Sequence, residues 1–163
     1  MPRLSSDNTE HIFLLPINCM SIFDAIRNDH QKQRTLGDLL AKTHGDSDGR
    51  DELFTKLKDE LERHAKAEER HFYVPLMKKD LTQEKARHSV AEHHELDKII
   101  EELEQTDRSS AGWVATAKKL HEKLIHHLDE EEHEIFQLAG KVLSESEQQQ
   151  LASDYVAAMG EGD

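Results

Sequence analysis

Hydrophobic positions recur at helical spacing over most of the chain. In the second of five such segments, Leu53, Leu57 and Leu61 fall on one stripe with charged residues between them, as in an amphipathic helix with one buried face. Capping serines, Pro75 and the polar loop 106–110 separate the segments. No segment alternates with a period of two, so no β-sheet is expected. The pattern predicts helices at about 21–43, 48–75, 82–105, 111–141 and 144–159.

Four long helices joined by short loops favour antiparallel neighbours. The expected fold is therefore all-α, an antiparallel up-down-up-down four-helix bundle over residues 21–143. Residues 1–20 are expected to form an N-terminal arm, because their apolar stretch is too short for a membrane helix and lacks the features of a secretory signal. Residues 144–163 are expected to form a short C-terminal helix and tail, opened by a capping box at Ser144 and Glu147.

Composition and charge narrow the classes of function. Hydrophobic residues make up 36% of the 163 residues and charged residues 34%, so the core is expected to be a thin seam between solvated faces. The formal net charge of −13 would repel phosphate backbones and anionic lipids. Neither nucleic acid nor a membrane is therefore an expected partner. The single cysteine, Cys19, cannot form an internal disulfide, and a reducing, cytoplasmic location is expected.

The chain contains 12 histidines, and several of them belong to an internal repeat. The second and fourth helical segments match at a fixed offset of 63 residues, as from 64 to 127, and the same offset relates the first and third segments. The sequence thus resembles two copies of a helical hairpin, with one histidine on the first helix of each copy and a His-x3-Glu pair on the second. The offset pairs His30 with His93, Gln33 with Leu96, His64 with His127, and Glu68 with Glu131.

The repeated polar residues are expected to face the core. His64 and Glu68 continue the stripe of Leu57 and Leu61, because positions three, four or seven residues apart share a helical face. Burying imidazoles and carboxylates costs on the order of several kcal/mol unless each finds a partner. A metal ion would supply one, since these groups suit iron, manganese, cobalt or zinc, and two carboxylates that can bridge suggest two ions. The candidate metal ligands are His30, His64, Glu68, His93, His127 and Glu131.

Simpler explanations of the same residues stay open. A single helical histidine is usually exposed or hydrogen-bonded, and a His/Glu pair one turn apart is commonly a weak surface contact. The polar layer of a metal-free structural bundle would merely fix the helix register. Other metal motifs fit less well. The sequence His121-Glu122 lacks a second histidine at the spacing of a zinc protease, and a ferritin-like site needs a glutamate that the first helix does not contain.

Four short motifs follow one another in a fixed order between residues 21 and 140. They are Asp-His30, His64-x3-Glu68-Glu69 before Pro75, Glu-His93, and His127-x3-Glu131-Glu132 before Ile-Phe136. This ordered set resembles the hemerythrin HHE cation-binding domain family. The resemblance implies an antiparallel four-helix bundle that holds two non-haem iron ions (Fe2+/Fe3+) joined by an oxo or hydroxo bridge; zinc or manganese is less expected.

The resemblance also implies a function for this centre. Dioxygen or another small ligand would bind the iron pair, in oxygen binding, sensing, or a redox or iron response. By the same resemblance all six candidates are ligands, and Glu68 and Glu131 bridge the two ions. An enzyme that acts on peroxide or nitric oxide, or a dizinc or dimanganese hydrolase, is the alternative.

The chain departs from the oxygen-carrying members of that family in the third helical segment. Those proteins have a His-x3-His pair there, whereas Ser89 and Asp97 stand four residues before and after His93. One iron is therefore expected to lack a protein ligand. Water, His88 or His94 could complete its coordination.

The fourth helical segment leaves a choice between two carboxylates. In the carriers the bridging carboxylate lies five residues after its histidine, so Glu132 is the alternative to Glu131. Other polar neighbours could accept hydrogen bonds from the free imidazole N–H groups, although they could equally be exposed charges. These neighbours are Asp29, Glu69, Glu92 and Glu132. Tyr73 and Trp113 are expected to be packing residues at the ends of the bundle.

Overall fold

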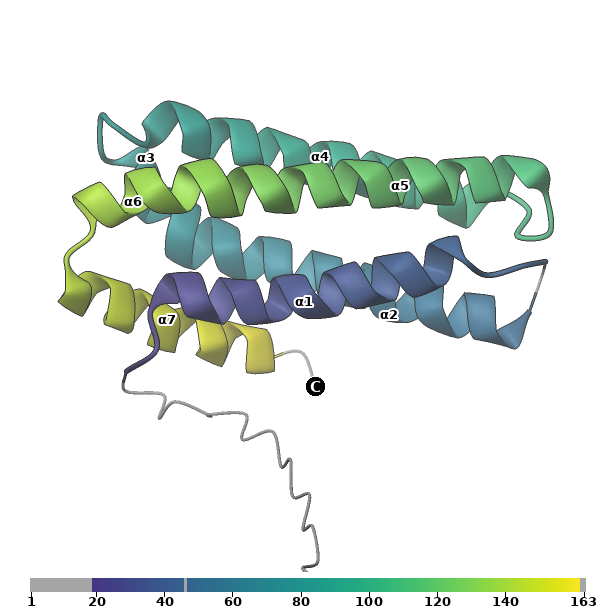
Figure 1. The fold of residues 1–163 in the computed structure, drawn as a ribbon, viewed down its shortest axis with the longest axis horizontal. Coiled ribbons are helices and arrows are strands. Elements are labelled where there is room, and N and C mark those ends of the chain that lie inside the picture. The colour runs from purple at the N-terminus through teal and green to yellow at the C-terminus, as the bar shows by residue number, and fades with distance from the viewer. Residues whose placement is uncertain (1–18, 46, 162–163) are drawn as a thin grey trace, which may run out of the picture.

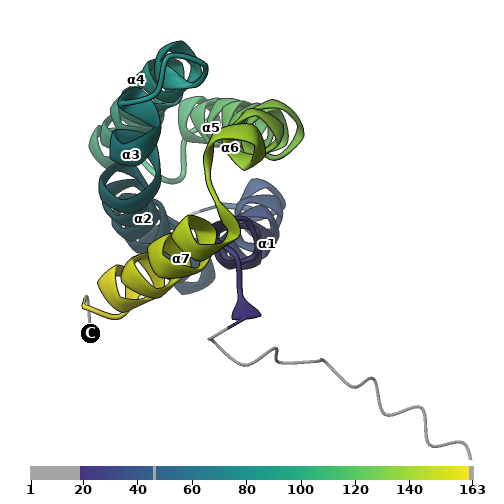
Figure 2. The same ribbon diagram turned by 90° about the vertical axis from the view of Figure 1, so that its left-hand side faces the viewer.

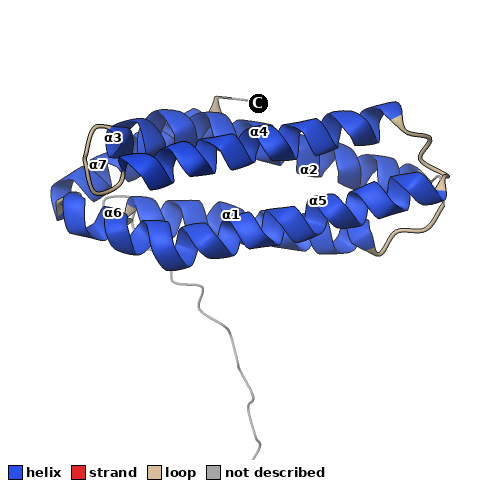
Figure 3. Ribbon diagram, turned by 90° about the horizontal axis from the view of Figure 1, so that it is seen from above, coloured by secondary structure: helices blue, strands red, loops and turns tan. Residues whose placement is uncertain are grey.

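A computed structural model describes residues 19–45 and 47–161, and within these ranges it contains helices and no strand (Figure 3). Two π-helical turns, η2 and η3, each continue an α-helix without a break. Nearly all of the predicted N-terminal arm, residues 1–20, lies outside the described residues. The elements in chain order are α1 (Ile22–Ala41), α2 (Asp48–Glu68), η2 (Glu69–Tyr73), α3 (Val74–Met77), α4 (Gln83–Gln105), α5 (Ala111–Glu130), η3 (Glu131–Ile135), α6 (Phe136–Val142) and α7 (Glu145–Gly160).

Serine side chains cap the N-termini of four helices. Ser21, Ser47, Ser110 and Ser144 precede α1, α2, α5 and α7, and each hydroxyl accepts a hydrogen bond from the backbone N–H three residues later. The capping box predicted at Ser144 is confirmed, because the side chain of Glu147 also accepts from the backbone of Ser144. Local sequence therefore determines where these helices begin.

The long helices form the predicted antiparallel four-helix bundle (Figure 1). Helix α1 packs against α2 and α5, and α4 packs against the same two neighbours. The C-terminal helix α7 crosses the outside of the bundle and contacts α1, α2 and η2 (Figure 2). Among the described residues, no helix combines the length and the apolar character that crossing a membrane requires.

The buried hydrophobic residues form two clusters along the bundle axis. We call the cluster under α3, α6 and α7 the aromatic half and the cluster toward the α1–α2 loop the leucine half. Large buried residues of the aromatic half are Phe72, Tyr73, Phe136 and Tyr155. Those of the leucine half include Leu40, Leu57, Leu61, Leu96, Leu103, Trp113, Leu120 and Leu124.

Candidate metal centre

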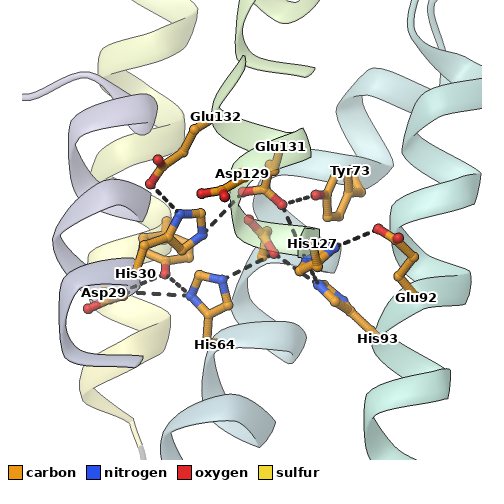
Figure 4. A network of polar contacts seen from close by, with 12 residues as sticks. Asp29, His30, His64, Tyr73, Glu92, His93, His127, Asp129, Glu131 and Glu132 are labelled. Atoms are coloured by element: carbon orange, nitrogen blue, oxygen red, sulfur yellow. Dashed lines mark hydrogen bonds and ion pairs between the residues drawn. The ribbon is translucent and has the colours of Figure 1, made fainter. Parts of the chain in front are cut away.

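The structure gathers all six candidate ligands between the four long helices (Figure 4). None of the six is more than 4% exposed. The two hairpins contribute equally, since each supplies one histidine from its first helix and a His-x3-Glu pair from its second. Helix α1 supplies His30, α2 supplies His64 and Glu68, α4 supplies His93, α5 supplies His127, and η3 begins with Glu131.

The Nε2 atoms of the imidazoles turn toward the two carboxylates. His64 Nε2 and His93 Nε2 each lie 3.2 Å from Oε2 of Glu68. Glu131 is placed in the same way, with Oε1 3.4 Å from His30 Nε2 and Oε2 3.6 Å from His127 Nε2. Each carboxylate therefore lies between one histidine of the first hairpin and one of the second, which is the position of a bridging ligand.

The donor atoms divide into two overlapping groups. Possible ligand atoms of Glu68, His93, His127 and Glu131 lie within 4.8 Å of one another, and so do those of His30, His64 and Glu68. Glu68 belongs to both groups. The arrangement therefore has the dimensions of two adjacent cation positions that share a carboxylate.

Three of the four imidazoles form a hydrogen bond to a carboxylate through Nδ1, the ring nitrogen that points away from the centre. Glu132 Oε1 lies 2.8 Å from His30 Nδ1, and Glu92 Oε2 lies 2.7 Å from His127 Nδ1. The third pair joins Glu69 Oε1 to His93 Nδ1 at 3.0 Å. An ionised carboxylate can only accept, so these Nδ1 atoms carry the proton and leave the Nε2 lone pairs directed inward. Of the two interpretations left open for these glutamates, the structure supports acceptance from the imidazoles.

The fourth imidazole is held through the C-terminal helix. His64 Nδ1 lies 2.7 Å from the hydroxyl of Tyr155, and that hydroxyl lies 2.5 Å from Oδ2 of Asp29. The phenol has one proton and donates it to the carboxylate, so it accepts from His64 Nδ1–H. Asp29 thus acts on the imidazole, in agreement with one of its two interpretations, but through Tyr155, which no sequence pattern indicated.

Several inward atoms have no hydrogen-bond partner among the described residues. They include Nε2 of His30 and His64, both carboxylate oxygens of Glu68 and Oε1 of Glu131. Two more ring nitrogens, His93 Nε2 and His127 Nε2, face each other at 3.1 Å, although their other nitrogens already carry the protons. Lone pairs gathered in this way repel one another unless a cation or a proton lies between them. The donor set therefore fits metal ions.

The pKa values of the buried histidines and of Glu68 also indicate that positive charge stabilises the centre. Burial alone would lower the pKa of His30, but its contacts with Glu131 and Glu132 outweigh burial and raise the pKa to about 9. Glu68 and Glu69 likewise overcome burial and raise the pKa of His93 to about 10. Burial opposes ionisation of Glu68, yet the neighbouring imidazoles hold its pKa well below the usual range. Without a metal ion, protons on the imidazoles would balance the carboxylates, and a metal cation would replace them.

Two π-helical turns place adjacent glutamates on opposite sides of a histidine ring. Turn η2 begins directly after Glu68 and turn η3 begins at Glu131. A wider turn shifts the phase of the helix. Glu68 and Glu69 lie at opposite nitrogens of His93, and Glu131 and Glu132 lie at opposite nitrogens of His30. Phe72 and Tyr73 at the end of η2 are both 0% exposed. Counting at 3.6 residues per turn cannot reveal this shift, so neither π turn was predicted from the sequence.

Tyr73 has a different position from the one predicted. It was expected to pack at the end of the bundle, but its hydroxyl donates a hydrogen bond to Oε2 of Glu131, and its ring lies edge-on to His93 with centroids 5.8 Å apart. Burial and the Glu131 and Glu68 carboxylates raise the pKa of Tyr73, so the phenol keeps its proton and remains a donor. Its place directly before a predicted helix break concealed this role.

The structure also separates the alternative ligands from the centre. His88 and His94 have side chains that are 54% and 67% exposed, and neither belongs to the two donor groups. His88 instead approaches Glu92 and Glu130 at the bundle surface. Glu132 holds His30 Nδ1 and the guanidinium of Arg34, so the inward carboxylate is Glu131.

Comparisons with known proteins agree with this geometry. The sequence model of the hemerythrin HHE cation-binding domain family matches residues 21–139. A DNA nickase of Nostoc sp. (strain PCC 7120) is 26% identical over 139 residues, which are 85% of this chain and 39% of the relative's length. The crystal structure of a hemerythrin HHE cation-binding domain-containing protein from Mycobacterium kansasii aligns with a TM-score of 0.78 at 22% identity and covers 86% of each chain. The last likeness shows a shared fold.

Proposed function

Because the chain belongs to the hemerythrin HHE cation-binding domain family, we propose that it holds two non-haem iron ions and binds dioxygen or another small diatomic ligand. The family and the buried His/Glu cluster indicate metal binding. The observation that carries the proposal is that four imidazoles direct their Nε2 atoms at two buried carboxylates. Several of these inward atoms have no hydrogen-bond partner among the described residues, which the interior of a protein rarely tolerates.

Different residues would bind the two iron ions and orient the imidazoles. His30 and His64 would hold one ion and His93 and His127 the other, while Glu68 and Glu131 would bridge them. The surrounding Asp29, Glu69, Glu92 and Glu132 fix each ring orientation and make the imidazoles more basic. When bound, an iron pair would supply one-electron redox chemistry and open coordination positions for a small ligand.

The number of protein donors favours iron over zinc. The two donor groups offer four and three protein ligands, and four is the full complement that zinc usually takes in structural sites. Iron accepts further ligands, so the same donors leave it room for an external molecule.

The space beside the imidazoles limits what can bind. A cavity of about 10 Å³ touches the rings of His64, His93 and His127. That volume is about what one water molecule requires, so a diatomic ligand or peroxide is of suitable size and the bulky substrate of a hydrolase is not. DNA strand cleavage, the activity named for the Nostoc relative, is not part of this proposal. The chain spans only 39% of that protein, and its net charge of −13 would repel a phosphate backbone.

Metal content and the absorption spectrum test the proposal together. Protein purified without chelator and reconstituted with Fe(II) under anaerobic conditions should hold two irons per chain, and absorption bands of a ferric pair should appear in air. His127→Ala should lose at least one iron. His126→Ala is the matched control, because its side chain lies next along α5 but is 70% exposed.

Three results would overturn the assignment. The first is substoichiometric iron after reconstitution, and the second is an H127A protein that binds as much iron as the wild type. Full occupancy by Zn(II) or Mn(II) with no change in air would replace iron with another metal.

A further inference from the structure

One buried residue beside the centre has no partner. Gln33 on α1 is 0% exposed, and neither its amide oxygen nor its amide nitrogen has a hydrogen-bond partner among the described residues. Buried amide groups are almost always paired, and an exception requires an explanation. The amide offers two N–H donors and one acceptor, so it is equipped to bind a polar molecule.

The internal repeat shows that this amide interrupts an apolar layer. The 63-residue offset pairs Gln33 of α1 with Leu96 of α4, and Leu61 of α2 with Leu124 of α5. All four side chains line the same small cavity, and all four are buried. Three positions of the layer therefore carry leucine, and the fourth carries a glutamine of similar length.

The cavity lies directly against the metal-binding imidazoles. Its other walls are formed by His64, His93 and His127, and its volume is about 10 Å³. Half-buried Ala65 on α2 and exposed Asp97 on α4 also line it, so the cavity approaches solvent at these two helices. A small molecule bound here would touch the imidazole side and the amide of Gln33 at once.

We propose that Gln33 donates an amide hydrogen bond to the small ligand bound in this cavity, and that it thereby favours ligands with a strong acceptor atom. This inference rests on the proposed function, because the ligand is the one that the iron pair would take. Hydrogen bonds to charged acceptors are stronger than those to neutral ones. Anionic or strongly polar ligands, with azide as the probe, therefore gain most from the amide.

Two substitutions isolate the amide. Gln33→Leu completes the leucine layer, and Gln33→Met keeps the length of the side chain without a donor. In the Gln33→Leu background, Leu96→Gln moves the amide to the equivalent place in the second hairpin. Iron per chain is measured first for every protein, and azide is then titrated into the ferric form by absorption.

The expected result is a loss of azide affinity without a loss of iron. Both single variants should hold as much iron as the wild type and bind azide about ten- to a hundredfold more weakly, and the relocated amide should restore part of the affinity. Without metal, Gln33→Leu should melt at a higher temperature than the wild type, because an unpaired buried amide has been removed.

The possible failures are distinct. A wild-type chain that binds no iron overturns both the proposed function and this inference. Iron in all variants together with unchanged azide affinity overturns only the role of Gln33 and leaves water as the partner of its amide. A metal-free Gln33→Leu protein less stable than the wild type would also overturn it, because Gln33 would then have a partner within the protein.

Discussion

The two halves of the bundle core are built by different rules. In the leucine half, apolar side chains of all four helices pack on one another, and the buried Arg50 has partners. Its guanidinium donates to Thr43 and to the carbonyl of Arg108, and it lies 4.6 Å from the ring centroid of Trp113. The buried charge of this half is therefore satisfied within the protein.

The aromatic half is incomplete without a cation. Except for one oxygen of Glu60, the unpaired buried side-chain atoms of the described residues belong to the centre or to Gln33 and Ser89 beside it. The contrast indicates that the leucine half stabilises the fold by itself, whereas the aromatic half loses stability to form a binding site. Changes in one half should therefore have effects that differ in kind from changes in the other.

Metal removal should produce the largest difference between the halves. At free metal about 1,000 times the dissociation constant, the bound protein should be about 4 kcal/mol more stable than the metal-free protein. Hydrogen exchange should show the lost protection in η2, η3 and the adjoining turns of α2 and α5, with little change around Trp113. Equal loss of protection in both halves would contradict the division of the core.

A cavity in the leucine half should reduce stability without touching the metal. Leu103 is 0% exposed, and Leu103→Ala should lower the free energy of unfolding by about 3 kcal/mol. Ten residues of α4 separate it from His93, which is about 15 Å along the helix, so its effect should add to that of metal removal. Denaturant unfolding with and without metal measures both terms. A drop in iron per chain would show that the halves are coupled.

The fold and the six inward residues could be predicted because both are expressed as helical periodicity. His64 and Glu68 continue a leucine stripe, and the repeat at His127 and Glu131 shows that the pattern is not a single coincidence. Serine caps such as Ser144 mark helix starts by their own hydrogen bonds. Each of these signals is local in the chain, so sequence spacing is sufficient to detect it.

The remaining parts of the centre depend on contacts between distant segments. Tyr155 reaches His64 only because α7 folds back across α1 and α2, and no spacing rule connects residues 91 positions apart. Tyr73 faces Glu131 from the end of the π turn η2. Gln33 can be recognised as an unpaired amide beside the cavity only when the three leucines packed around it are known. Such roles appear when packing is known, whereas periodicity records only which face of a helix is buried.

Removing the hydroxyl of Tyr155, which lies on α7 outside the four long helices, should have an effect of intermediate size on stability and metal affinity. Tyr155→Phe keeps the ring but leaves His64 Nδ1 and Asp29 Oδ2 without their shared partner. We expect a loss of about 2 kcal/mol in stability and a tenfold or greater loss in metal affinity. Val156→Ala, at the next and 39% exposed position, is the control and should change neither. Unchanged metal affinity in Y155F would mean that α7 only covers the bundle.

The smallest effect should be the release of protons when metal enters the aromatic half. Contacts with Glu131 and Glu132 raise the pKa of His30 to about 9 despite burial, and Glu68 and Glu69 raise that of His93 to about 10. Both are therefore protonated near pH 7.5 in the metal-free protein. Metal binding requires their neutral form, so calorimetry in buffers of different ionisation enthalpy should detect about two protons released per chain.

The raised imidazole pKa values also make the stability of the metal-free protein depend on pH. Raised imidazole pKa values stabilise the metal-free fold fully below about pH 6.5, and this contribution disappears as the pH rises through about 9 to 10. Metal-bound imidazoles carry no such proton, so the stability gap between bound and metal-free protein should widen from pH 7 to pH 10. Glu69→Gln removes one carboxylate that raises the pKa of His93 and should reduce the proton release, whereas Glu101→Gln, on the exposed face of α4, should not. No proton release from the wild type would mean that the lone pairs of the aromatic half are balanced in some other way.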